Sequence, residues 1–162
     1  MSEKVTAILS EEHKTVLAML ERFEKSLRKF DITAIKETVK FFDEKIVLHR
    51  RKEEEVLFPE LKPIVGEESG PVVCMLDEHK QEKELIETLR KNVAGKPSEE
   101  TKKAITNAGY AIIDLLTKHI WKEDNVLFPM AESVLPAETK EKVAKGFNAI
   151  GNFCCECAGH SK

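Results

Sequence analysis

The feature that most constrains this chain is a segment of eleven residues that occurs twice. Residues 49–59 read HRRKEEEVLFP and residues 119–129 read HIWKEDNVLFP, so seven of the eleven positions are identical at an offset of 70 residues. A shorter match, Glu-His-Lys, occurs at residues 12–14 and again at 78–80. Each half of the chain therefore holds a segment with one histidine followed by a segment with the pattern His-x-x-x-Glu, which predicts a duplicated helical hairpin.

The spacing of apolar residues predicts that these segments are helices. Gly and Pro, 7 and 6 residues, are gathered at a few breaks, and between the breaks apolar residues recur at helical spacings. The predicted helices cover about residues 3–30, 32–59, 71–93 and 98–129, with a shorter fifth helix over 136–151, and residues 59–70 are predicted to form a loop. Short or moderate connections favour an all-α fold, an antiparallel up-and-down four-helix bundle. We expect a single bundle domain over residues 1–150 and a Cys-rich C-terminal tail over residues 151–162.

Composition excludes several classes of protein. The 162 residues carry a formal charge of −3, so the basic excess typical of nucleic-acid binding is missing. The longest stretches without charged residues are ten residues long, too short for a membrane span. The N-terminal residues show no secretory signal, so we expect a cytoplasmic protein with reduced thiols and no membrane partner.

The repeated motif predicts a metal site. Residues four apart share a helix face, so His49 and Glu53 point in one direction, as do His119 and Glu123, and the neighbouring apolar residues place both faces inward. A carboxylate buried without a partner is costly, and two bridged cations would compensate both glutamates. Nitrogen and oxygen ligands together suit iron, manganese or zinc better than calcium or magnesium. The predicted metal ligands are His13, His49, Glu53, His79, His119 and Glu123.

The order of these residues resembles the signature of the hemerythrin-like proteins, also called the HHE cation-binding domain. In that family a His, a His-x-x-x-Glu, a second His and a second His-x-x-x-Glu lie on four successive helices, and the resemblance covers about residues 5–130. It implies a non-haem centre of two iron ions (Fe2+/Fe3+), joined by two carboxylates and an oxo or hydroxo bridge.

Two positions depart from the oxygen carriers of this family. Those carriers have a further histidine where this chain has Lys83, so the chain is similar to the six-ligand branch, which is implicated in iron sensing and in nitric-oxide response or repair of iron centres. The carriers also take their last carboxylate at the position of Asp124, but the internal repeat favours Glu123.

The six-ligand set favours a protein that binds or senses a small diatomic ligand, O2 or NO, or iron status. One alternative is a redox enzyme that reduces nitric oxide or peroxide with electrons from a donor protein, and another is an iron donor for the repair of iron centres. No nucleophile paired with a base and no nucleotide-binding loop is found, so no catalytic residue is assigned.

The remaining polar and aromatic residues have simpler interpretations. Glu54, Glu55 and Glu82 are expected on a solvated face, with Glu82 as a possible spare or outer ligand because it follows His79 by three residues. The repeated Lys52 and Lys122 are expected to face solvent and pair with helix neighbours. Trp121 and Tyr110 are expected to be packing residues, and Tyr110 is assigned no catalytic role because it lies about half a turn from His119.

The tail contains the donors Cys154, Cys155, Cys157 and His160 within seven residues. These residues, together with Cys74, could bind a second metal or supply electrons, but their spacing fits no standard zinc site. The alternative is a poorly ordered terminus.

Overall fold

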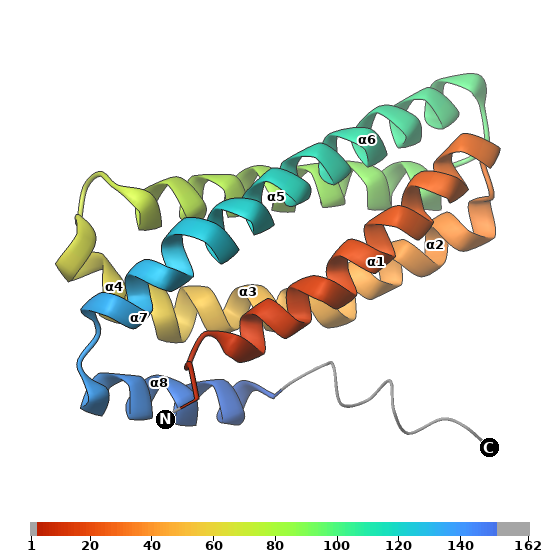
Figure 1. The fold of residues 1–162 in the computed structure, drawn as a ribbon. Helices are drawn as coiled ribbons and strands as arrows, with labels where there is room; N and C mark the ends of the chain where they lie inside the picture. Colours follow the sequence, from red (N-terminus) through yellow and green to blue (C-terminus); the bar gives the residue numbers. More distant parts are fainter. Residues whose placement is uncertain (1–2, 152–162) are drawn as a thin grey trace, which may run out of the picture.

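The fold is entirely helical over the part of the chain that the structure, a computed structural model, describes, residues 3–151 (Figure 1). The predicted all-α class is confirmed. The elements are α1 (Ala7–Lys29), α2 (Ile32–Phe41), η1 (Phe42–Ile46), α3 (Val47–Arg51), η2 (Lys52–Leu57), α4 (Phe58–Val65), α5 (Pro71–Ala94), α6 (Glu99–Lys122), η3 (Glu123–Leu127), α7 (Phe128–Val134) and α8 (Ala137–Ile150), where η marks a π-helical turn.

Four long rods form the bundle. The first is α1, the second runs without a break from α2 to α4, the third is α5, and the fourth runs from α6 to α7 (Figure 1). The first rod, α1, contacts α2 of the second rod and α6 of the fourth. The third rod, α5, contacts the same two elements, so each rod has two neighbours. The short α8 packs against η2 at one end of the bundle, as Figure 1 also shows.

Local sequence signals account for two of the helix starts. The side chain of Asp31 accepts a hydrogen bond from the backbone N–H of Ala34 at the start of α2. At the start of α6, Ser98 and Thr101 form a capping box. These caps satisfy backbone donors that would otherwise have no partner at the beginning of a helix.

The core is divided into two apolar clusters. One contains Val16, Phe23 and Leu116, and the other contains Leu9, Leu57 and Phe128. His13 lies on α1 between Leu9 and Val16, which belong to different clusters. The buried polar residues of the bundle therefore form a layer between two apolar regions, each of which excludes water from one side of it.

The rods with the His-x-x-x-Glu motif are longer than predicted. Helix continues past Pro59 to Val65 and past Pro129 to Val134, so the loop expected from residue 59 begins only at Gly66. Each proline is the second residue of a helical segment that follows a π-turn, where the hydrogen-bond register of the continuous helix changes. The Pro-based helix ends predicted from the sequence are therefore wrong.

The outer surface holds one further difference from expectation. Trp121 is 61% exposed and Tyr110 is 39% exposed, so the prediction that they are packing residues is wrong for Trp121 and at most partly right for Tyr110. Trp121 follows the inward-facing His119 by two residues, about 200° around the helix, which turns it to solvent. None of the helices between residues 3 and 151 has an apolar stretch long enough to cross a membrane.

Candidate metal centre

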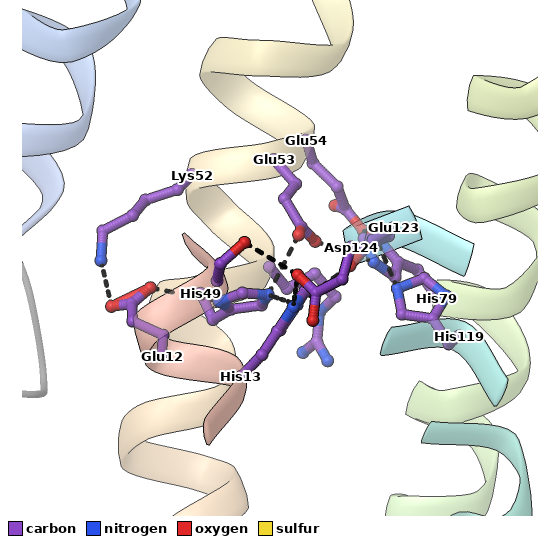
Figure 2. A network of polar contacts seen from close by, with 12 residues as sticks. Glu12, His13, His49, Lys52, Glu53, Glu54, His79, His119, Glu123 and Asp124 are labelled. Carbon is purple, nitrogen blue, oxygen red and sulfur yellow. Dashed lines mark hydrogen bonds and ion pairs between the residues drawn. The ribbon is translucent and has the colours of Figure 1, made fainter. Parts of the chain in front are cut away.

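The six predicted ligands meet in the polar layer of the bundle. His13 comes from α1, His49 and Glu53 from α3 and η2, His79 from α5, and His119 and Glu123 from α6 and η3, so all four rods contribute. All six are buried, with His49 the most exposed at 7%. Figure 2 shows their side chains directed toward one another.

The donor atoms form two groups that share both glutamates. One group contains His13 and His49, the other contains His79 and His119, and each also contains Glu53 and Glu123. Within a group, the donor atoms lie within 4.8 Å of one another. Two cations side by side would therefore each meet two imidazoles and would share both carboxylates.

The spacing of the donor atoms fits transition-metal ligation. The Oε1 and Oε2 atoms of Glu53 lie 3.0 Å from His49 Nε2 and 3.1 Å from His79 Nε2, and both oxygens of Glu123 lie 3.1 Å from an imidazole nitrogen. The Nε2 atoms of His13 and His49 are 3.1 Å apart. Two ligand atoms about 2.1 Å from one ion and at right angles to each other are separated by roughly 3.0 Å.

The glutamate oxygens support the same interpretation. All four oxygens of Glu53 and Glu123 are buried and none has a hydrogen-bond partner of acceptable geometry, although imidazole nitrogens lie nearby. A buried carboxylate without a hydrogen bond is rare in proteins, because desolvation of the charge is then uncompensated. Convergence on a shared cation accounts for both the short distances and the missing hydrogen bonds.

An outer ring of carboxylates orients the four imidazoles. The Nδ1 atoms of these histidines lie 2.8–3.1 Å from carboxylate oxygens, which leaves each Nε2 directed at the centre (Figure 2). Such hydrogen bonds fix the ring orientation and the tautomer of a ligand histidine. The acceptors are Glu12 for His49, Glu54 for His79, Glu78 for His119 and Asp124 for His13.

Two equivalent lysines bind this outer ring, but in different surroundings. Lys52 Nζ donates to Glu12 at 2.6 Å, and both side chains are completely buried. The equivalent Lys122 pairs with Glu78, but its side chain is 37% exposed. The prediction that Lys52 faces solvent is wrong. α8 packs against η2, the turn that carries Lys52, and a contact between two distant helices does not follow from the periodicity of either one.

The surrounding carboxylates raise the pKa values of all four imidazoles. Burial lowers the pKa of His49, but the charge of Glu53 and the hydrogen bond to Glu12 outweigh it and raise this pKa to about 10. The same balance of burial against carboxylates raises the pKa of His79 to about 9 and that of His119 to about 11. Burial raises the pKa of Glu53, yet the charge of His49 keeps it well below its usual range. A cation that enters the centre must therefore displace protons.

The two positions that separate this chain from the oxygen carriers lie outside the donor groups. Asp124 accepts from His13 Nδ1 at 2.8 Å and is 31% exposed, so Glu123 and not Asp124 stands among the donors. Lys83 is 48% exposed and its ammonium group donates to Glu54. Neither Asp124 nor Lys83 contributes an atom to the two groups.

A small cavity of about 10 Å³ adjoins the centre. All four histidines line it, but Glu53 and Glu123 do not. The cavity therefore lies on the side of the donor groups away from these two shared carboxylates. Its other walls are apolar, except for Arg50 and Glu82. The apolar wall residues are Val16, Ile46, Leu116 and Ile120.

Glu82 is 4% exposed and therefore does not lie on the solvated face expected from the sequence. Its place three residues after His79 was the only sequence signal for a role near the centre. Nothing in the sequence pointed to Arg50.

A much larger hollow lies elsewhere. It has a volume of about 780 Å³ and lies where Phe30 and the connection between α5 and α6 meet, some 17 residues along α1 from His13, or about 25 Å. None of the six predicted ligands lines it. Volume alone is therefore a poor guide to the chemistry of this protein.

Cys74 is not among the donor groups of the centre. Cys74 is an exposed free thiol on α5. Cys154, Cys155, Cys157 and His160, predicted as a second metal or redox site, lie outside the described residues.

Comparison with known proteins identifies the family. The hemerythrin HHE cation binding domain matches residues 4–131. The iron-sulfur cluster repair protein YtfE of Salmonella typhimurium (strain LT2) is 40% identical over 93 residues, 54% of this chain and 42% of that protein. The proteins of the same name from Escherichia coli O1:K1 and Escherichia fergusonii match to the same extent, so the chain spans less than half the length of these relatives. The chain belongs to the hemerythrin HHE cation-binding domain family, whose cofactor is a pair of iron ions.

Proposed function

We propose that His13, His49, Glu53, His79, His119 and Glu123 hold the two iron ions and that the centre binds a small diatomic molecule, O2 or NO. The observation that carries this proposal is the cavity beside the four histidines. Its volume of about 10 Å³ is close to the space of a single water molecule. A typical organic substrate needs roughly 300 Å³ or more, so a space of this size favours the smallest ligands.

The iron pair supplies open coordination positions and redox chemistry at this cavity. The chain itself performs three tasks. The imidazoles and shared carboxylates hold the ions, and the ring formed by Glu12, Glu54, Glu78 and Asp124 keeps each Nε2 aimed inward. The apolar walls around Val16 and Leu116 limit the entry of water and of larger molecules.

A second function, iron donation during the repair of iron centres, is favoured by the relatives. They are named iron-sulfur cluster repair proteins and are 40% identical over the matched residues. The described part of this chain has no broad cleft at the centre that would recognise a protein or an organic substrate, which is compatible with transfer of an ion. Reduction of nitric oxide or peroxide at the same centre is a third function that the redox chemistry of iron permits.

One set of experiments distinguishes the three functions. Protein loaded anaerobically with iron is titrated with NO and with O2, and the absorption spectrum and the gas consumed are recorded. Saturation at a fixed stoichiometry per chain supports binding, and sustained consumption in the presence of a reductant supports an enzyme. Transfer of iron to an apo iron-sulfur acceptor, followed by recovery of the acceptor's cluster, supports donation. An iron-loaded protein that binds neither gas would refute the primary proposal.

A further inference from the structure

Arg50 stands between the cavity at the metal centre and the outside of the bundle. A second hollow, of about 260 Å³, lies between η1, α3 and α5, and residues such as Asp43, Ile86 and Arg90 line it. Arg50 lines this outer hollow and also the inner cavity beside the histidines, and it is the one residue common to both linings. Its side chain is thus a partition between them.

A partly buried ion pair holds the partition in place. Nη1 of Arg50, on α3, donates to Oε1 of Glu82, on α5, at 2.6 Å. The two side chains are only 13% and 5% exposed. Burial keeps the two groups paired, because separating them would leave a shielded charge without a partner.

The outer hollow offers Arg50 an alternative position. Asp43 and Glu87 both line that hollow, where they pair with Arg90, and both are 40% or more exposed. If the guanidinium group moved outward, it would enter a solvent-exposed hollow that also holds the cations Lys83 and Arg90, so water would solvate its charge there. A movement of a single long side chain is then enough to join the two spaces.

We propose that the Arg50–Glu82 ion pair is a gate through which small ligands reach the di-iron centre. The inference rests on the proposed function, since it assumes that ligands bind in the histidine-lined cavity. In the closed position the pair separates the cavity from the outer hollow. In the open position Arg50 turns into the outer hollow, and a diatomic molecule passes.

A gate has a kinetic signature that a binding contact lacks. It changes the rates of entry and exit by the same factor, and the equilibrium affinity stays the same. A residue that stabilises the bound ligand instead changes the affinity, mainly through the exit rate.

The test compares NO binding to iron-loaded variants. Stopped-flow mixing gives the association rate, and excess deoxymyoglobin as a trap gives the dissociation rate. In R50A we expect both rates to rise about tenfold, equivalent to about 1.4 kcal/mol of barrier, with a dissociation constant within twofold of the original. E82Q, which keeps the bulk but removes one charge, should give a smaller rise of both rates. The double variant R50A/E82A leaves no unpaired buried charge and should match R50A.

The matched control is R51A. Arg51 is the next residue on the same helix, but it is 47% exposed and pairs with Glu55, so its removal should leave both rates unchanged. Iron content of two per chain and an unchanged absorption spectrum establish that each variant retains the centre. Unchanged rates in R50A and R50A/E82A, or a change in affinity as large as the change in rate, would overturn the gate. If the original protein holds two irons and binds no NO, the proposed function fails instead.

Discussion

The buried pair of Lys52 and Glu12 gives the sharpest test of how the metal site is built into the fold. Replacement of Lys52 by Met keeps the length of the side chain but removes the ammonium group that lies 2.6 Å from Glu12. Both side chains are completely buried, so the Glu12 carboxylate would keep only its bond from His49. Removing one partner of a buried ion pair costs about 3–5 kcal/mol, because the remaining charge is desolvated without compensation.

The duplication supplies the matched control. Lys122 makes the equivalent pair with Glu78, but it is 37% exposed, so K122M should cost no more than about 1 kcal/mol. Urea unfolding of the metal-free proteins, followed by circular dichroism, measures both changes. With a slope of about 2 kcal/mol per molar urea, K52M should lower the midpoint by roughly 1.5–2.5 M and K122M by at most about 0.5 M. Equal shifts in the two variants would refute the reasoning that burial by α8 makes the pairs different.

Further predictions concern the metal. E123Q should reduce the bound iron well below two per chain, whereas D124N should retain the iron but weaken its binding about 10–100-fold, measured by competition with a chelator. Because the pKa values of His49, His79 and His119 are about 10, 9 and 11, uptake of iron at pH 7 should release roughly three protons, detectable with an indicator dye. These values lie above the ordinary 6.5, so the stability that these histidines give the metal-free protein is fully present below pH 6.5, falls progressively above it, and is lost once the pH has passed about 9 to 11. Iron affinity rises over the same range, and a pH-independent affinity would contradict this.

The helical class and the six central residues were predictable because both follow from the repeat. A motif such as His49–Glu53 defines one helix face, and its copy at His119–Glu123 must face the same interior in a duplicated bundle. The structure brings these residues together, and their role as ligands is tested by the metal measurements. The helix ends at Pro59 and Pro129 were not predictable, because a π-turn is not marked by residue composition.

The charged residues around the centre were harder to predict than the centre itself. The sequence shows that Lys52 and Lys122 are equivalent, but only tertiary packing by α8 makes one of them buried. Likewise Glu82 and Arg50 come from different rods, and their 2.6 Å contact depends on how α3 and α5 are placed. Periodicity assigns a residue to a face of its own helix, but it does not identify its partner on another helix.

Iron analysis combined with Mössbauer spectroscopy of anaerobically purified, iron-supplied protein tests the central claim most directly. We predict two irons per chain, magnetically coupled through shared ligands, and loss of this signal in H49A. Iron-supplied protein that holds no iron, or that holds a single uncoupled iron unaffected by H49A, would contradict the account.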